Sequence, residues 1–156
     1  MKIHKISKEN KEKIIYLIKN NLINSVIFNL PQSFIKNYFI REIINKKKYI
    51  SLICKIKNKP AGMIIVKKKN TDFSLNLKIM TFIYCIPTFF LNDFKIFYKF
   101  YYFLFKRKKI KKKINYSLAC EIIYICVDQK YRNKGIGTKL LKFSEKKLLK
   151  DHKFLI

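Results

Sequence analysis

One stretch near the end of the chain constrains the fold most, because its pattern predicts a strand, a tight turn and a helix in direct succession. An apolar run, 122–127, follows Glu121 and ends at Asp128. The next segment holds Gly135 and Gly137, two of only three glycines among 156 residues. Glycine allows a close backbone approach and dihedral angles that a Cβ would forbid. A strand that leads through such a turn into a helix N-terminus presents unpaired N–H groups, so the stretch predicts a phosphate-binding site.

The length of the chain predicts one domain over residues 1–156, long enough to bury a core. Its formal net charge of +27 is typical of nucleic-acid partners, but 33 of the 36 basic residues are lysine and three are arginine. Surfaces that recognise phosphates or bases usually favour the bidentate guanidinium of arginine. We therefore expect most of this charge to lie on solvated faces, with no nucleic acid as the partner.

The cysteines, Cys54, Cys85, Cys120 and Cys126, form no CxxC pair and have no neighbouring histidine at ligand spacing. We expect no metal site from this pattern. Free thiols without a disulfide framework suit a reducing cytoplasm, and the N-terminus lacks the apolar core of a signal peptide. The chain is therefore expected to be cytoplasmic.

The first 68 residues predict a strand, two helices and a hairpin. Residues 2–6 suit a strand, and 8–22 suit an amphipathic helix with Ser7 as its N-cap. A second helix is expected to start at Pro31 and to run to about residue 45. Strands at 49–56 and 61–66, joined by a turn at 58–60, complete the hairpin.

Residues 69–117 form an aromatic and basic insert. An uncharged run, 79–92, is shorter than the ~20 residues that span a bilayer, and Pro87 is expected to interrupt it. A further helix is expected after residue 92, and seven of the eight positions in 106–113 are basic. One interpretation is a pair of helices packed on the domain. A second is peripheral membrane contact through 79–113, with aromatic residues in the headgroup region and lysines on anionic lipid. A third is stacking on single-stranded nucleic acid.

The segment Val127-Asp128-Gln129-Lys130-Tyr131-Arg132-Asn133-Lys134-Gly135-Ile136-Gly137-Thr138-Lys139-Leu140-Leu141 resembles the acetyl-CoA motif of the GNAT superfamily of N-acetyltransferases. The family pattern is a strand ending in Val, then Arg/Gln-x-x-Gly-x-Gly/Ala, then a helix with Leu, and every element is present. The upstream order agrees with the family, and Lys59-Pro60-Ala61-Gly62 looks like its usual entry to the third strand.

The resemblance implies an α/β (α+β) fold with a mixed central sheet, in the order β-α-α-β-β-(insert)-β-α. The family fold continues with another strand, a helix and a closing strand pair. Residues 152–156 are expected to begin that next strand, so the domain is expected to be incomplete at its C-terminus. The part beyond normally completes the substrate cleft and often supplies a tyrosine acid for the CoA thiolate.

The resemblance also implies acetyl-CoA as co-substrate and a primary amine as acceptor. Backbone amides of the turn would hold the CoA pyrophosphate, and the end of the strand would pair with the pantetheine arm. The cofactor-binding residues that follow from this are Ile125, Cys126, Val127, Arg132, Asn133, Lys134, Gly135, Ile136, Gly137 and Thr138. For the Arg132 side chain, a contact with the pyrophosphate and a plain surface role both stay open.

Glu121 is the candidate catalytic base. It matches the position where histone-acetylating members of the family place their base glutamate, in the pattern E-[IV]-[IV]-[FY]-x-x-V. The alternative is a strand-edge carboxylate that faces solvent or pairs with a lysine. Tyr124 and Asp128 are weaker candidates for the same role, and they are expected to be a packing residue and a turn residue, respectively. The alternative function is an inactive GNAT-like basic module that associates with a membrane surface or nucleic acid, and the acceptor amine and the oligomeric state stay open.

Overall fold

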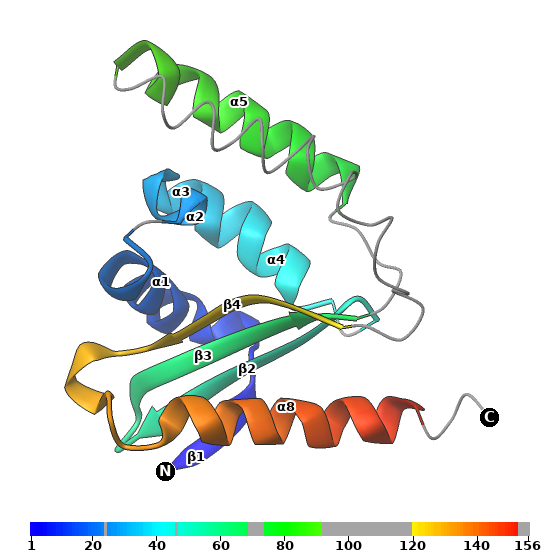
Figure 1. Ribbon diagram of the computed structural model, residues 1–156. Coiled ribbons are helices and arrows are strands. Elements are labelled where there is room, and N and C mark those ends of the chain that lie inside the picture. Colours follow the sequence, from blue (N-terminus) through cyan, green and yellow to red (C-terminus); the bar gives the residue numbers. More distant parts are fainter. Residues whose placement is uncertain (24, 46, 69–73, 92–119, 153–156) are drawn as a thin grey trace, which may run out of the picture.

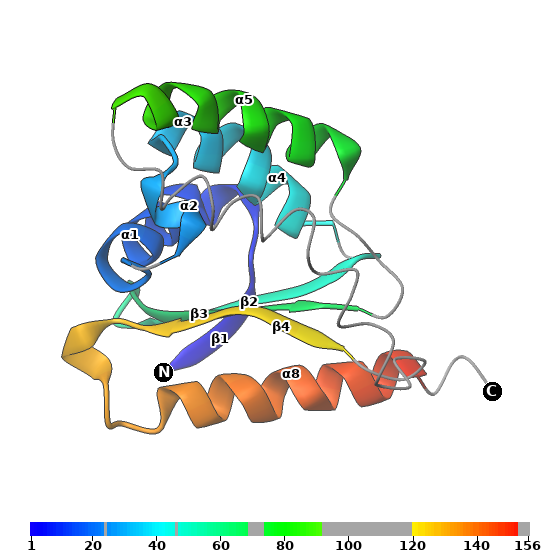
Figure 2. The same ribbon diagram turned by 45° about the horizontal axis from the view of Figure 1, so that its top comes forward.

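The computed structural model describes residues 1–23, 25–45, 47–68, 74–91 and 120–152. Within these ranges, four antiparallel strands form one sheet in the order β1-β2-β3-β4. The strands are β1 (Lys2–Lys5), β2 (Tyr49–Ile56), β3 (Lys59–Lys67) and β4 (Glu121–Val127). Figures 1 and 2 show three layers, with α1 to α5 on one face of the sheet and α8 on the other. The predicted order of elements is therefore present in the described ranges, and the strand pairings there are all antiparallel, whereas a mixed sheet was expected.

The hairpin of β2 and β3 forms the centre of the sheet. Ile56 pairs with Lys59 across a two-residue turn, in which Lys57 and Asn58 have φ angles of 47° and 61°. Two successive positive φ angles are typical of a type I′ turn, whose twist matches that of the flanking strands. The predicted hairpin is confirmed, although β3 begins two residues earlier than expected.

The first helical layer consists of short segments. They are the 3₁₀ turn η1 (Lys8–Asn10), α1 (Lys11–Asn21), α2 (Val26–Asn29), α3 (Gln32–Phe34), the π-helical turn η2 (Ile35–Phe39) and α4 (Ile40–Ile43). Ser7 makes no capping bond to the backbone and instead accepts a hydrogen bond from Asn10 Nδ2 at 2.8 Å. The second predicted helix is confirmed but ends at Ile43, because Lys48 N and Tyr49 N both donate to Asn45 O and so turn the chain into β2.

Helix α5 (Leu75–Leu91) lies outside α3 and η2, on the same side of the sheet. Leu77 and Thr81 are buried there, and the Tyr84 ring lies 5.4 Å from that of Phe34. The expected interruption at Pro87 is wrong, because α5 is continuous through this position. Proline removes one backbone donor and strains one turn, which a helix packed along its side can tolerate. The predicted helix after residue 92 and the basic run 106–113 lie outside the described residues.

Helix α8 (Ile136–His152) covers the opposite face of the sheet. Its buried residues Ile136 and Leu140 pack against a second core formed with β2 and β3. The strand expected over residues 152–156 does not begin at His152, which is the last residue of α8, and residues 153–156 lie outside the described ranges. No helix in the described part of the chain has the length and apolar character needed to cross a bilayer.

Candidate functional site

The turn between β4 and α8 places the predicted phosphate-binding residues at the N-terminus of a 17-residue helix. The first hydrogen bond of this helix joins Lys139 N to Gly135 O at 3.0 Å. The N–H groups of Gly135 to Thr138 come before it in the chain and are therefore the four that the helix itself leaves without a helical partner. Asn133 and Gly135 have φ angles of 61° and 69°, on either side of Lys134. These left-handed residues lead the chain into the N-terminus of α8, and the first N–H groups of a helix lack helical partners and can bind an anion.

The two glycines of the turn serve different purposes. Gly135 has open space where a Cβ would lie, so its conformation rather than its surroundings favours glycine. Gly137 has no positive φ, and an added Cβ would meet only Val127 Cγ2 at an ordinary 3.8 Å. The protein itself therefore does not require glycine at 137. A ligand that approaches the helix N-terminus closely would require it.

Strand β4 lies at one edge of the sheet, beside the turn. Asp128 N donates to Ala61 O at 2.9 Å, and the register pairs Cys126 with Met63. In an antiparallel ladder, alternate residues direct their N–H and C=O groups to opposite sides. Ile125 and Val127 therefore direct theirs away from β3, and no other strand in the described ranges pairs with that edge. This geometry suits the predicted pairing with an extended amide-containing chain.

The third glycine, Gly62, explains how closely β4 approaches β3. A Cβ at Gly62 would lie 2.8 Å from Cys126 O, within a distance that real Cβ atoms do not show. Sequence reasoning linked Gly62 only to the family's third strand. The fact that it faces β4 depends on a register between residues more than 60 positions apart.

Basic side chains surround the turn. Arg132 Nε donates to Val127 O at 3.4 Å, so this guanidinium lies at the open edge of β4. Lys134 Nζ lies 5.8 Å from the centroid of the Tyr131 ring, a cation–π arrangement. Lys130, Arg132 and Lys134 together give this end of the molecule a positive field that attracts phosphate.

Asp128 fixes the start of the turn. Its carboxylate is buried and accepts a hydrogen bond from Lys130 N at 3.0 Å, which confirms its predicted role as a turn residue. A hydrogen bond with Asp128 and the charge of this carboxylate raise the pKa of the Tyr16 phenol. Tyr16 belongs to α1, so this contact ties the first helical layer to the turn.

The side chains of β4 on the α1 face are packing residues. The Tyr124 ring lies 5.8 Å from the Phe39 ring in an edge-to-face arrangement, as predicted for a packing residue. Burial raises the pKa of the Cys126 thiol to about 12, an effect that outweighs the hydrogen bond from the Met63 backbone. A thiol in this state is a poor nucleophile, so Cys126 offers the site its backbone only.

Glu121 lies at the far end of β4 from the turn. Its Oε2 atom is 2.7 Å from Lys67 Nζ, and Lys67 is also its partner residue in the β3–β4 ladder. Pairing with a lysine is one of the two roles that the sequence leaves open for Glu121. The ion pair leaves its catalytic role untested.

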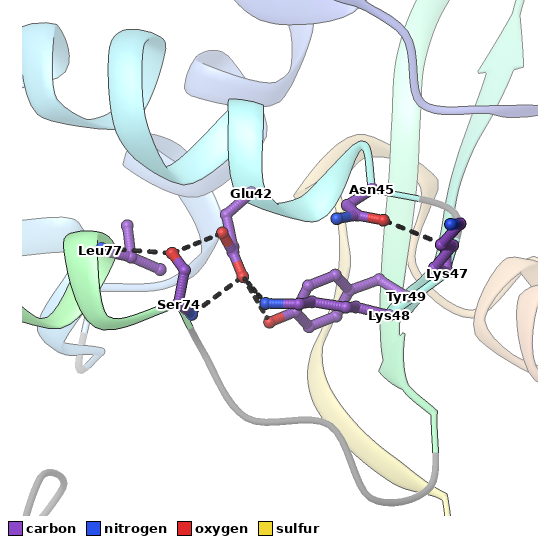
Figure 3. Close-up of polar contacts among 7 residues, drawn as sticks. All are labelled: Glu42, Asn45, Lys47, Lys48, Tyr49, Ser74 and Leu77. Atoms are coloured by element: carbon purple, nitrogen blue, oxygen red, sulfur yellow. Dashed lines mark hydrogen bonds and ion pairs between the residues drawn. The ribbon is translucent and has the colours of Figure 1, made fainter.

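A second carboxylate, Glu42, lies at the same end of the sheet and was not predicted as a site residue. Figure 3 shows that it joins α4, the start of β2 and the start of α5. Ser74 donates to it through N at 3.1 Å and through Oγ at 2.7 Å, and Tyr49 Oη donates at 3.1 Å. Burial alone would raise the Glu42 pKa, but the donors from Ser74, the charge of Lys48 and the hydroxyl of Tyr49 together lower it.

One sequence signal could have singled out Glu42. It is one of only nine acidic residues, and it lies within an otherwise apolar helix face between Phe39 and Ile43. Its partner Ser74 also caps α5, because Ser74 Oγ accepts from Leu77 N at 3.3 Å. Within the described ranges, no group of three or more His, Cys, Asp or Glu side chains is arranged to hold a metal ion.

Comparison with known proteins adds two findings. The sequence model of the family described as "Acetyltransferase (GNAT) family" matches residues 95–155, which include β4, the turn and α8. A search of curated proteins gives no significant match. The family resemblance that the motif predicts is thus confirmed over the C-terminal part of the chain.

The fold is similar to solved structures of N-acetyltransferases. A ribosomal-protein-alanine N-acetyltransferase from Brucella melitensis biovar Abortus 2308 is 12% identical with a TM-score of 0.53, over 96% of this chain and 72% of that one. An aminoglycoside 6'-N-acetyltransferase complexed with coenzyme A is 14% identical with a TM-score of 0.53, over 96% of this chain and 56% of that one. An N-acetyltransferase from Thermoplasma acidophilum gives 16% identity and a TM-score of 0.47, over 96% of this chain and 72% of that one.

Proposed function

We propose that this protein transfers an acetyl group from acetyl-CoA to a primary amine. The C-terminal part of the chain matches the GNAT family, and its fold is similar to that of solved N-acetyltransferases. The observation that carries the proposal is the turn between β4 and α8. Left-handed residues at Asn133 and Gly135 and the N-terminus of α8 lie beside an open strand edge. Few other ligands combine a pyrophosphate with an extended amide-containing arm.

The residues of the turn fit CoA in three ways. The N–H groups of Gly135 to Thr138 precede the first helical bond of α8 and can bind the pyrophosphate, whose negative charge the helix dipole favours. Gly137 allows the phosphate oxygens to approach the backbone closely. The outward N–H and C=O groups of Ile125 and Val127 suit the amides of the pantetheine arm. The solved aminoglycoside acetyltransferase of similar fold also binds coenzyme A.

Transfer by direct attack requires a neutral amine. An alkyl amine has a pKa of about 10.4 and is mostly protonated at neutral pH. In this proposal Glu121 accepts a proton from the amine, directly or through a water molecule. The amine nitrogen then forms a bond to the acetyl carbonyl carbon, the C–S bond breaks, and the CoA thiolate leaves and takes up a proton.

Glu121→Gln tests this role while keeping the size of the side chain. We expect kcat to fall by about 10² to 10⁴, the range of general-base catalysis, with the Kd for acetyl-CoA unchanged. Release of the CoA thiol with glucosamine, 1,4-diaminobutane and a lysine-containing peptide measures turnover, and calorimetry measures binding. Glu12→Gln is the matched control, because Glu12 also pairs with a lysine, Lys36 at 2.9 Å, on the surface.

Two results would contradict the proposal. Absence of acetyl-CoA binding to the wild-type chain would remove its basis and favour an inactive GNAT-like module. Normal turnover by Glu121→Gln would leave the acetyltransferase but assign Glu121 to its ion pair alone.

One observation favours a second role, peripheral contact with an anionic membrane surface. Leu75, Ile79 and Ile83 are 72%, 48% and 48% exposed, and they share the side of α5 opposite to buried Leu77. An exposed apolar stripe on a chain of net charge +27 complements a bilayer that bears negative headgroups. We propose that this stripe inserts among the headgroups.

Vesicle flotation tests the membrane role. The double variant Ile79→Asn, Ile83→Asn is expected to lose most binding to phosphatidylglycerol vesicles. Leu149→Asn, which changes a more exposed apolar residue on α8, is expected to keep it. Equal flotation of both variants would show that the stripe is not needed for the binding, and absence of flotation of the wild-type chain would exclude a membrane role.

A further inference from the structure

The position of Glu121 depends on an irregularity in β4. Ile65 pairs with Tyr124 but the next residue, Val66, pairs with Ile122, so Ile123 has no partner residue in β3. A one-residue bulge reverses which face the following side chains occupy. Without it, Glu121 would share a face with Ile125 and Val127, toward α8.

With the bulge, Glu121 lies on the face of α4 and α5. Tyr49, Lys67 and Glu121 form one line of partner residues across β2, β3 and β4, and residues directly opposite in a ladder share a face. Tyr49 belongs to the core cluster under α4 and α5. The Glu121 carboxylate is therefore on the side of the sheet where Glu42 binds Ser74 and Tyr49.

Lys67 is one group that holds this carboxylate. Its Nζ lies 2.7 Å from Glu121 Oε2, and the two side chains are 13% and 39% exposed. Lys67 is thus mostly enclosed while Glu121 stays accessible to a substrate. The pair Lys36–Glu12 has a similar distance, 2.9 Å, but both of its side chains are at least half exposed.

The stability gained from such a pair is small. Enclosing the Lys67 ammonium removes much of its hydration, and the attraction to the Glu121 carboxylate largely offsets that loss without a large surplus. Stability therefore gives little reason to enclose Lys67 beside Glu121. Orientation gives a better one, because a charge-assisted hydrogen bond fixes the direction in which a carboxylate presents its other oxygen.

We propose that Lys67 is a positioning residue for Glu121, which holds the carboxylate on the α4–α5 face in the orientation that accepts a proton from the acceptor amine. This inference rests on the proposed acetyltransferase function. It assigns the acceptor amine to the side of β4 that faces α4 and α5, while the CoA pyrophosphate binds at the other end of the strand.

Lys67→Met removes the ammonium and keeps an unbranched side chain. We expect kcat to fall about tenfold, which is less than the fall expected for Glu121→Gln because the base itself remains. The KM for acetyl-CoA is expected to stay unchanged. Lys67→Arg is expected to restore most of kcat because it keeps the charge and the donor. Lys36→Met is the matched control and is expected to leave both constants unchanged.

The outcomes separate this inference from the function on which it rests. An inactive wild-type chain would overturn the acetyltransferase proposal. An active wild type that loses turnover in Glu121→Gln but not in Lys67→Met would overturn only the role of Lys67. Thermal melting adds a test without turnover: if the shifts of Lys67→Met and Glu121→Gln are simply additive in the double variant, the two side chains do not interact and the inference is wrong.

Discussion

Gly135 and Gly137 lie two residues apart, yet a methyl group should have opposite effects at these positions. Gly135→Ala places a Cβ on a residue with φ of 69° and is expected to destabilise the protein by about 1 kcal/mol. Gly137→Ala meets no close atom within α8 and is expected to keep or raise stability, since alanine favours helices by up to ~1 kcal/mol. Urea unfolding of both variants measures the difference.

The same two variants test the ligand that the turn is proposed to hold. We expect Gly137→Ala to weaken acetyl-CoA binding in calorimetry despite its unchanged stability, because the Cβ lies where phosphate oxygens approach the backbone. Unchanged affinity would mean that Gly137 is only a helix residue and would remove one support of the CoA site.

Individual residues were predictable where the relevant pattern is local. The glycines, Arg132 and the strand end lie within about a dozen positions, so their spacing alone indicated the turn. Cys126 is buried and packs as a small hydrophobic residue. The partner of Glu121 was not predictable, because it depends on pairing across the insert and on a bulge that no residue type in 121–127 signals.

The Glu42 contact is an attachment point between elements, since it links α4 and β2 to the start of α5. Glu42→Gln leaves the side chain in place but weakens the bonds from Ser74 and Lys48. Because the folded state lowers the Glu42 pKa below its ordinary 4.5, the carboxylate adds stability above that pH and loses it as pH falls through the folded value. We expect the free energy of unfolding of Glu42→Gln to fall less than that of the wild type as the pH is lowered from 7 to 3, as measured by urea unfolding.

Ser74→Ala probes the same attachment from the side of α5. It removes both the cap of α5 and a hydrogen bond to Glu42, so a loss of about 1 kcal/mol is expected at pH 7. Ser33→Ala changes an exposed serine in α3 and is the control. Equal stability of the two variants would show that the contact does not hold α5 in place.

Among the elements, the hairpin and β4 follow from apolar, β-rich runs beside turn residues, α8 follows from helical periodicity, and all were predicted closely. The second helix was predicted as one segment, yet it includes the π-helical turn η2, because tertiary packing of Ile35 and Phe39 sets the local winding. Helix α5 was open to several interpretations because its apolar residues show no polar face. Its buried side became clear only from contacts with Phe34 and Tyr38.

At the scale of the whole molecule, the excess of 27 positive charges should act on folding and on binding with opposite signs. Self-repulsion destabilises a compact chain, and salt shortens the screening length from about 10 Å at 0.1 M to about 3 Å at 1 M. The same screening weakens attraction of the CoA phosphates to Lys130, Arg132 and Lys134. We therefore expect added NaCl to raise Tm and to raise the Kd for acetyl-CoA.

Scanning calorimetry and titration calorimetry in the same NaCl series check this expectation. Potassium glutamate at equal ionic strength distinguishes screening from specific effects of chloride. A Kd that does not change with salt would contradict a phosphate contact at the turn.

The bulge at Ile123 implies that the length of β4, rather than the identity of its residues, assigns Glu121 to its face. Deletion of one residue at this point would leave the carboxylate in the sequence but transfer it to the α8 side, away from Lys67 and α5. Two relatives with the same glutamate and the same glycine turn could therefore differ in chemistry because their β4 strands differ in length by one residue. The number of residues between Glu121 and the glycine turn is therefore a better guide to this site than the residue types in β4.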